Sequence, residues 1–269
     1  MSWTGERLET YIYTRDAVEH LHRYSLLTPY IADKTVLDIA CGEGYGSAIM
    51  SKTAARVYGV DIDADTVTKA QAKYKSENLS FQEGSAAAIP LQDHSVDVVV
   101  SFETIEHHDK HREMLSEIKR VLKPSGMLII STPDKLYYSD ARNFKNKFHV
   151  KELYKQEFVD LIAAHFANLQ LLTQEYVNGN SLIQDDASEK IAIFTGNYSE
   201  VQTQHIPPLY LIAIAADVEF ERQKASLFDG NSFVNAEIDS KVRYVYQSTT
   251  YKLGHTLLRP FKFIKHLFT

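Results

Sequence analysis

The sequence predicts an α/β fold built on a buried, mostly parallel sheet. From residue 35 onward, apolar runs of strand length alternate with longer amphipathic stretches, which is the order expected when helices cover both faces of a parallel sheet. Most of these runs are continuously apolar and rich in β-branched residues, as strands buried on both faces are.

The first half of the chain supplies five of the expected strands and two helices. The strands are Thr35–Ala40, Arg56–Asp61, Asn78–Glu83, Val96–Phe102 and Gly126–Thr132. Between them, residues 66–75 and 110–122 have helical periodicity, and the second helix carries an apolar stripe that ends before Pro124.

The second half departs from this alternation. Residues 133–149 form a polar, aromatic loop that is too long for a simple connection. A helix is expected at residues 150–166, followed by strands Leu169–Val177 and Leu209–Ala216. A polar insertion between these two strands contains one short apolar run, Ile191–Thr195.

Four regions follow from this pattern. Residues 1–30 form an N-terminal helical cap with a helix from Asp16 to Leu27, and residues 31–220 form the α/β domain. Residues 221–240 are a linker or surface helix, and residues 241–269 are a basic amphipathic tail.

The composition is that of a globular protein in a reducing compartment. Hydrophobic residues make up 44% of the chain and charged residues 24%, and Cys41 is the single cysteine, which excludes a disulfide framework. Residues 1–16 mix acids and bases, and no apolar run reaches the roughly 18 residues of a membrane span. We therefore expect a cytoplasmic protein without a secretory signal.

The net charge of −6 is unevenly distributed. Residues 241–269 contain six Lys or Arg and no acid, so residues 1–240 carry −12. An acidic body argues against nucleic-acid binding, which needs a basic face.

The tail has its own pattern. Leu253, Leu257, Phe261, Ile264 and Phe268 recur at helical spacing, and Pro260 is expected to break or kink that helix unless it starts a new one. A basic amphipathic helix suits peripheral contact with the inner membrane face or with a glycosyltransferase, and packing back onto the acidic body is the alternative.

A glycine-rich turn follows the first strand. Gly42, Gly44 and Gly46 stand at alternate positions between the strand and a helical stretch. Glycine lets a backbone approach a ligand closely and adopt a positive φ. The spacing is shorter than in the dinucleotide-binding turn Gly-x-Gly-x-x-Gly. A tight strand-to-helix turn without a ligand is the alternative interpretation.

Two carboxylates and a third turn surround this glycine loop in the sequence. Asp38 lies inside the first strand, where an acid suits a cationic ligand such as an ammonium or sulfonium group. Asp61 ends the second strand, the position at which ribose hydroxyls are held in such sheets. The third strand leads into Gly84-Ser85-Ala86, a turn placed to flank an adenine.

Taken in order, these segments resemble class I S-adenosylmethionine-dependent methyltransferases. The matching segments are the glycine loop, VYGVDID, Gly84-Ser85-Ala86, SVDVVVSFETIEHH and EIKRVLKPSGMLIISTP. The resemblance implies a Rossmann-like seven-stranded sheet of order 3-2-1-4-5-7-6 with the last strand antiparallel. Residues 31–220 would then be the methyltransferase domain.

The resemblance also implies roles for single residues, with S-adenosylmethionine as cofactor. Asp38, Gly42 and Gly44 would line its methionine portion, and Arg23 would meet the methionine carboxylate. Asp61 would hold the ribose, and Ile62 would pack on the adenine. The remaining cofactor contacts would be Ser85, Ala86, Phe102 and Glu103. Many relatives have Asp where this chain has Ser85, which puts the adenine amino contact there in doubt.

Candidates for proton transfer follow the fourth strand. Glu106 and His107 come directly after it, and His149 ends the long loop. A histidine suits a general base near neutral pH. Alternatively, these residues and Glu103 bind a divalent cation that activates an acceptor hydroxyl, since the spacing resembles metal-dependent methyltransferases of ubiquinone synthesis and of small-RNA ends. A purely structural role is the third interpretation.

The segments GERLE, EHLHRY and FHVKELYKQEF, together with the tail, resemble methyltransferases of bacterial surface-polysaccharide (O-antigen) biosynthesis. This resemblance implies O-methylation of a sugar hydroxyl on a cell-envelope glycan or its precursor. The alternatives are O-methylation of a small phenolic or isoprenoid metabolite, and a non-catalytic cofactor-binding subunit that partners a glycosyltransferase.

Overall fold

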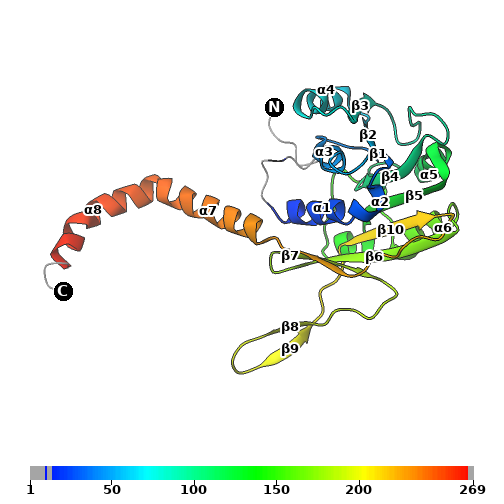
Figure 1. The fold of residues 1–269 in the computed structure, drawn as a ribbon. Helices are drawn as coiled ribbons and strands as arrows, with labels where there is room; N and C mark the ends of the chain where they lie inside the picture. The colour runs from blue at the N-terminus through cyan, green and yellow to red at the C-terminus, as the bar shows by residue number, and fades with distance from the viewer. Residues whose placement is uncertain (1–9, 11–13, 266–269) are drawn as a thin grey trace.

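The protein is organised around one nine-stranded sheet (Figure 1). The computed structural model describes residues 10 and 14–265, with side chains described as far as residue 257. The strand order is β11-β7-β6-β10-β5-β4-β1-β2-β3. Five of these strands run parallel: β1 (Thr35–Ile39), β2 (Arg56–Asp61), β3 (Leu79–Glu83), β4 (Val96–Phe102) and β5 (Leu122–Pro133).

The seven expected strands occur in the expected order, but the sheet does not end with them. β10 (Tyr210–Ala216) pairs antiparallel with both β5 and β6 (Asn168–Val177). Beyond β6, the sheet continues with β7 (Asn180–Asp185) and β11 (Ser226–Phe228). The prediction of a seven-stranded sheet was therefore wrong, because the sheet contains two further strands.

The first additional strand is joined to β6 by a two-residue turn. Asn178 and Gly179 have φ of 48° and 92°, and Val177 pairs with Asn180. Positive φ at both central residues defines a hairpin turn for which Asn-Gly is the preferred sequence. The Asn-Gly pair is visible in the sequence and indicates a hairpin. β7 was nevertheless not predicted as a strand, because polar residues stand at both of its ends.

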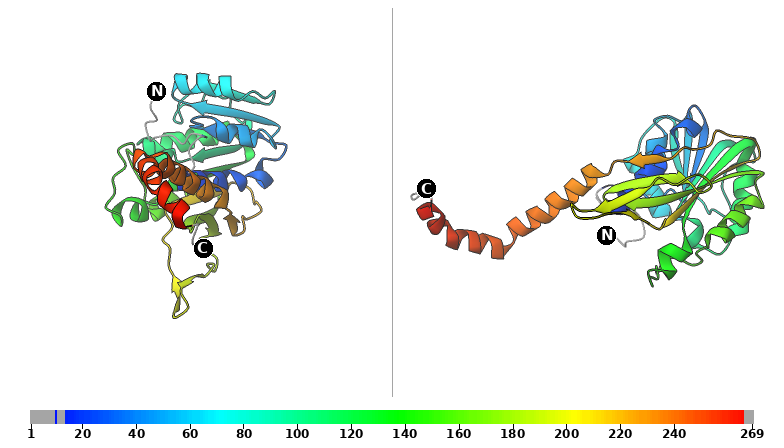
Figure 2. Two further views of the ribbon diagram at one scale, coloured as in Figure 1. Left: turned by 90° about the vertical axis from the view of Figure 1, so that its left-hand side faces the viewer. Right: turned by 90° about the horizontal axis from the view of Figure 1, so that it is seen from below.

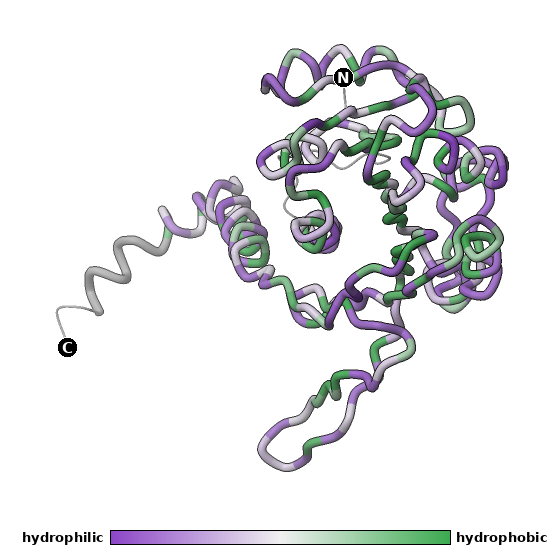
Figure 3. The backbone as a smooth tube through the Cα atoms, turned by 45° about the vertical axis from the view of Figure 1, so that its right-hand side comes forward, coloured by the Kyte–Doolittle hydropathy of each residue, from purple (hydrophilic) through white to green (hydrophobic). Residues whose placement is uncertain are grey.

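Helices cover both faces of the sheet. α1 (Arg15–Ser25), α2 (Thr28–Ile31) and α3 (Tyr45–Met50) pack on one face, and α5 (His111–Val121) and α6 (Lys155–Ala163) on the other. α4 (Ala64–Lys73) contacts β2 and β3. In β4, Val98 and Val100 pack in the hydrophobic core on the side of α1, and Val99 packs in the core on the side of α5. Successive side chains of a strand point to opposite faces of the sheet. Figure 3 shows that the hydrophobic residues are concentrated in the central part of the domain.

The helix expected at residues 150–166 is shorter than predicted. Residues 150–154 lie outside α6 because their backbone is bonded elsewhere. The N–H groups of Val150 and Lys151 donate to the Glu106 carbonyl, and Leu153 forms a β-bridge with Asp134. This segment therefore fastens the long loop to the end of β4. The loop itself contains a π-helical turn, η2 (Leu136–Asp140).

Two parts of the chain project from the domain. β8 (Ile193–Gly196) and β9 (Val201–Gln204) form a separate hairpin, and α7 (Asn231–Gln247) and α8 (Thr249–Lys265) form an extended arm (Figures 1 and 2). α7 runs through the expected boundary at residue 240, and α8 runs through position 260, so the expected proline break is absent.

The arm points away from the domain rather than lying on it (Figure 2). Its described apolar side chains include Ile238, Val245 and Leu257, exposed by 52%, 54% and 70%. No helix in the described part of the chain is long and apolar enough to cross a membrane. Contact of residues 241–269 with a membrane surface or a glycosyltransferase stays a prediction.

The start of α3 is packed tightly against α1. A Cβ added to Gly46 would lie 2.1 Å from Cζ of Tyr24. Tyr24 cannot easily retreat, because it is buried with edge contacts to Tyr45 and Phe102 at ring distances of 5.6 and 5.1 Å. Glycine at this position therefore allows α1 to reach the glycine loop.

Gly46→Ala is expected to destabilise the protein by about 1–3 kcal/mol through overpacking. Thermal unfolding followed by circular dichroism should show a Tm lowered by about 3–10 °C. Gly254→Ala in α8 is the matched control, since nothing lies within 4 Å of its added Cβ. Equal Tm values for the two variants would contradict this close packing.

Candidate functional site

A two-lobed cleft opens at the carboxyl ends of β1, β2 and β4. The first lobe has a volume of about 210 Å³ and the second about 350 Å³. The lobes adjoin, because Ala40, Gly42, Glu103 and His107 line both of them. In open α/β sheets, ligands bind at this edge beside the point where the strand order reverses, and here β1 lies between β4 and β2.

The glycine loop forms the floor of the cleft. Gly42 and Gly44 have φ of 55° and 91°, and Ala40 has φ of 59°. A positive φ is unfavourable for alanine, and such backbone strain often occurs at binding sites. Gly42 lines both lobes. Gly44 lies behind the loop, where an added Cβ would be 2.9 Å from the Phe81 ring.

The end of β2 is joined to this loop by a carboxylate. Asp61, only 3% exposed, accepts a hydrogen bond from the Gly42 backbone N–H at 2.9 Å through Oδ2, and one from the Asp63 N–H at 3.0 Å through Oδ1. Its neighbour Ile62 is 70% exposed. Both residues line the second lobe.

The turn after β3 completes the second lobe. Ser85 and Ala86 both line it, and the Ser85 hydroxyl accepts a hydrogen bond from the Ala87 N–H at 3.2 Å. The second lobe therefore brings together Gly42, Asp61, Ile62, Ser85, Ala86 and Glu103 of the residues that the sequence indicated for the cofactor.

Asp38 does not line either lobe. It is 1% exposed and accepts a hydrogen bond from the Ser47 hydroxyl of α3 at 2.6 Å. Burial, reinforced by the charge of Asp61, raises the pKa of Asp38 to about 7. The carboxyl thus supports the glycine loop from beneath in this conformation.

Glu103, which lines both lobes, forms an ion pair with the fully buried Arg23. Glu103 has a positive φ of 53°, and its Oε1 accepts a hydrogen bond from Ser131 at 2.7 Å. Oε1 also lies 3.4 Å from Nη1 of Arg23, which donates to Gln174 at 3.0 Å. Phe102, before Glu103, lines the first lobe.

Arg23 is fully buried and lies behind the lining residues rather than among them. Its guanidinium group is 4.8 Å from the centre of the Tyr210 ring, which does line the first lobe. Nε and Nη2 of Arg23 have no hydrogen-bond partner among the described residues. Direct contact of Arg23 with a methionine carboxylate would therefore require Tyr210 or Glu103 to move.

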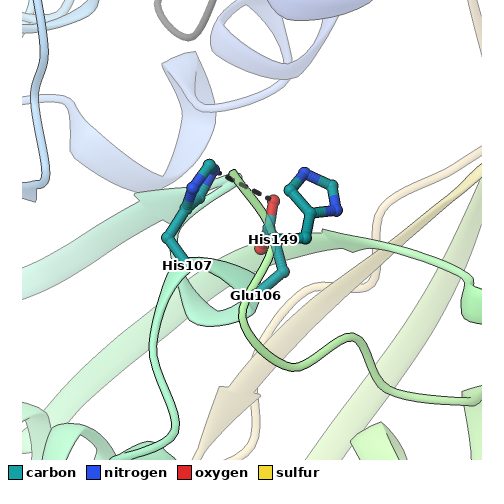
Figure 4. A group of neighbouring side chains, drawn as sticks. All are labelled: Glu106, His107 and His149. Carbon is teal, nitrogen blue, oxygen red and sulfur yellow. Dashed lines mark ion pairs between the residues drawn. The ribbon is translucent and has the colours of Figure 1, made fainter. Parts of the chain in front are cut away.

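Glu106, His107 and His149 meet at the wall of the first lobe (Figure 4). Figure 4 shows the Glu106 carboxyl between the two imidazole rings. One ligand atom from each residue lies within 4.8 Å of the others. Glu106 and His107 belong to the 3-10 turn η1 (Ile105–His107), and His149 belongs to the loop that is fastened to it.

Hydrogen bonds fix the two rings. Nδ1 of His107 lies 3.2 Å from the Phe148 carbonyl oxygen, which can only accept, so Nδ1 carries the proton and Nε2 the lone pair in the neutral ring. Nδ1 of His149 lies 2.5 Å from Glu152, and its Nε2 lies 2.9 Å from the Asn146 amide nitrogen. Both rings are thus held by hydrogen bonds to Phe148 and Asn146, which also line the first lobe, and to Glu152, which does not.

Glu106 is 1% exposed, and burial followed by the charge of Glu103 raises its pKa well above the usual range. Oε2 accepts a hydrogen bond from Thr132 at 3.3 Å, whereas Oε1 has no hydrogen-bond partner among the described residues and lies 4.0 Å from Nε2 of His107. An unsatisfied buried carboxyl oxygen at a cleft indicates a ligand or cation. Base and metal interpretations both remain compatible with this geometry.

The sequence did not identify several residues of the first lobe. Tyr24, Tyr45, Asn146, Phe148 and Tyr210 all line it. Tyr210 begins β10, which is antiparallel to β5, so its start lies at the edge where the parallel strands end. The position of Tyr210 at the start of an antiparallel strand could therefore have predicted that it lies near the site. Tyr24 and Tyr45 reach the lobe only through the tertiary packing of α1 and α3.

The fold is an α/β domain with a cleft at its strand ends, and part of the chain is similar to known methyltransferases. Residues 37–130 match the methyltransferase domain family. The chain is 38% identical over 166 residues to a probable S-adenosylmethionine-dependent methyltransferase of Mycolicibacterium smegmatis, covering 59% of this chain and 62% of the relative. It is 26% identical over 169 residues to a fatty-acid O-methyltransferase of the same species, covering 60% of this chain and 55% of the relative.

Among solved structures, a methyltransferase from Thermotoga maritima has a TM-score of 0.55 and 17% identity, with 75% of this chain and 90% of that chain covered. The likeness to this structure shows that the two chains share a fold. Residues 37–130 therefore match a methyltransferase domain family, and the chain has the Rossmann-like fold of solved methyltransferases. The chain spans about 60% of the length of the curated relatives it matches.

Asp38 makes stability depend on pH. Its pKa is about 7 in the folded protein against 3.8 as the ordinary value, so the folded state holds the proton more tightly, and stability falls as pH rises from about 4 to about 7. The Asp38→Asn variant has no carboxyl at this position and therefore does not lose stability in this way as the pH rises. The variant's advantage in unfolding free energy should be about 2 kcal/mol larger at pH 8 than at pH 5.

Urea unfolding at the two pH values measures this difference. Asp65→Asn is the control, because Asp65 is exposed in the first turn of α4. An Asp38→Asn advantage that is the same at both pH values would show that the Asp38 carboxyl is ionised throughout.

Proposed function

We propose that this protein transfers a methyl group from S-adenosylmethionine to an oxygen, namely a sugar hydroxyl of a cell-envelope glycan or its precursor. The observation that carries the proposal is the position of His107, which lines both lobes of the cleft. A group at the junction can meet the donor in one lobe and the acceptor in the other. The relative named as a fatty-acid O-methyltransferase supports oxygen as the nucleophile.

The residues of the cleft suit the cofactor. Gly42 places no side chain on the floor of the cleft, Asp61 offers a carboxylate to ribose hydroxyls, and Ile62 with Ala86 offers apolar surface to an adenine. Bound there, S-adenosylmethionine supplies an electrophilic methyl group on a sulfonium. The protein's contribution is then to align the acceptor and to remove its proton.

We propose His107 as the proton acceptor. Its Nε2 carries the lone pair in the neutral ring, because Nδ1 is directed at the Phe148 carbonyl. The acceptor oxygen takes the methyl group as its bond to the sulfonium sulfur breaks, and the hydroxyl proton passes to Nε2. Oε1 of Glu106, 4.0 Å from Nε2, faces the imidazolium that forms. His149, whose two ring nitrogens are engaged by Glu152 and Asn146, packs edge-on against the His107 ring at 5.1 Å and helps to hold that ring in place.

The alternative use of the same three side chains is a divalent cation site. One carboxyl and two imidazoles are a ligand set suited to a first-row transition metal. The Phe148 carbonyl would hold His107 in the tautomer that ligates through Nε2, as metal-binding histidines are commonly held. Asn146 opposes this use at His149, since its amide already donates to that ring's Nε2.

His107→Ala is expected to lower kcat/KM about 10²–10⁴-fold, the usual contribution of a general base, while the affinity for S-adenosylhomocysteine changes little. Turnover is measured as S-adenosylhomocysteine release with methyl glycosides, palmitate and catechol as acceptors. His165→Ala is the control, since His165 lies at the end of α6, bonded to the Leu161 carbonyl.

Each acceptor gives a distinct answer. Turnover with a glycoside supports the proposal, whereas turnover with palmitate or catechol alone refutes the sugar acceptor. Wild-type activity that is abolished by EDTA and restored by Mg²⁺ or Mn²⁺ would replace the general base with the cation site. Cofactor binding without any turnover would contradict an enzymatic role.

A further inference from the structure

A separate cavity of about 470 Å³ lies outside the cleft, at the amino end of α6 and the stem of the β8–β9 hairpin. We call it the outer cavity. Thr173 and Glu175 of β6 line it, while Gln174 between them bonds Arg23. Since successive strand residues point to opposite faces, the outer cavity is on the face of the sheet opposite α1.

The floor of the outer cavity is polar although it is buried. Thr173, Glu175 and Gln184 are 2%, 5% and 5% exposed. A sheet face in the interior is normally apolar, because burying polar groups costs free energy unless each finds a partner. Three adjacent polar side chains at this depth therefore require an explanation.

These side chains form one hydrogen-bonded network. The Thr173 hydroxyl donates to Oε1 of Glu175 at 3.1 Å, and the Gln184 amide donates to Oε2 at 3.1 Å. Lys190 donates to Thr173 at 3.0 Å, and the Ile191 N–H donates to the Gln184 amide oxygen at 2.9 Å. The network holds a carboxyl, an amide and a hydroxyl in fixed positions on the floor of the cavity, as sites that recognise hydroxyl groups do.

The outer cavity carries little net charge. Both lysines that line it are near one carboxylate: Asp186 lies 3.0 Å from Lys155 and 3.9 Å from Lys190. Burial raises the pKa of Glu175 and of Asp134, and with Asp186 these carboxyls leave the cavity without an excess of positive charge. An uncharged ligand suits this surface better than an anion.

The walls are aromatic and aliphatic. Tyr137 and Tyr154 line the outer cavity, together with Ile191 and Ile206 from the hairpin stem. A pyranose ring matches this combination, because its C–H face packs on aromatic and aliphatic surface while its hydroxyls meet the polar floor. An acyl chain would set only apolar surface against the polar floor.

Adjacent residues connect the outer cavity to the cleft. On η2, Tyr137 lines the outer cavity and Tyr138 lines the first lobe of the cleft. At the start of β10, Pro208 lines the outer cavity and Tyr210 the first lobe. One turn of chain thus separates the two spaces, on the side of the cleft where the acceptor is expected.

We propose that the outer cavity is a carbohydrate subsite that binds one neutral pyranose unit of the acceptor, a unit other than the one that is methylated. This inference rests on the proposed sugar acceptor. It adds to it a second recognition point on the opposite face of the sheet. Acceptor length would then matter, since a single sugar cannot fill both places.

Binding is tested without turnover, by titrating the ¹⁵N-labelled full chain with the methyl glycosides of glucose, galactose, mannose and N-acetylglucosamine. The Ile191 backbone amide and the Gln184 side-chain amide report on the outer cavity, and the Gly42 amide reports on the cleft. We expect at least one glycoside to shift the Ile191 and Gln184 signals saturably, with a millimolar Kd.

Tyr137→Ala is expected to raise that Kd at least about fivefold, and Glu175→Gln, which keeps the side-chain size, about threefold. Tyr198→Ala removes a tyrosine from the exposed tip of the β8–β9 hairpin and should leave the Kd unchanged. Unchanged affinity for S-adenosylhomocysteine in all three variants shows that they are folded.

The inference is overturned if no glycoside shifts Ile191 or Gln184, if Tyr137→Ala leaves the Kd unchanged, or if octanoate binds there and no glycoside does. Shifts confined to Gly42, or glycoside turnover without outer-cavity binding, would refute the subsite while leaving the proposed function intact. Outer-cavity binding without any methyl transfer would refute the proposed function instead.

Discussion

The hydrogen bond from the Gly42 N–H to the Asp61 carboxylate, 2.9 Å long, is the contact on which the site depends. It joins the loop after β1 to the end of β2, and therefore fixes the floor of the cleft relative to its far wall. The loop reaches Asp61 only because Ala40 and Gly42 both adopt a positive φ. The second oxygen of Asp61 holds the Asp63 N–H, and Asp63 in turn caps α4 through the N–H groups of Asp65 and Thr66.

The opposite wall is held by α1, which bridges distant parts of the sheet. His22 contacts the hydroxyls of Ser181 on β7 and Ser226 on β11, at 2.9 Å each, and Arg23 bonds Gln174 on β6. Tyr24 packs on Gly46 at the start of α3. The two strands that were not expected thus serve to anchor the helix that closes the cleft. β6 has polar residues on both faces: Gln174 supports α1, and Glu175 belongs to the floor of the outer cavity.

Local sequence was sufficient for the parts of the site that depend on strand ends. Asp61, Ile62, Ser85 and Glu103 each follow or end a parallel strand, so their meeting at one edge follows from the topology alone. Arg23 and Asp38 were different, because side chains from other helices and strands surround them. Gln174, Glu103 and Tyr210 enclose Arg23, and Ser47 covers Asp38. Likewise, the outer cavity is assembled from β6, β7, η2, α6 and the hairpin stem, and no single segment carries a signal for it.

The central claim, that the cleft holds S-adenosylmethionine with Asp61 on the ribose, is tested most directly by calorimetric titration of S-adenosylhomocysteine into wild type, Asp61→Ala and the exposed-site control Asp65→Ala. We expect saturable binding to wild type and to Asp65→Ala, with affinity at least about tenfold weaker in Asp61→Ala, or about 1.4 kcal/mol. Binding that is equal in all three proteins would contradict the assignment of Asp61. Binding of NADH in place of S-adenosylhomocysteine would contradict the cofactor itself.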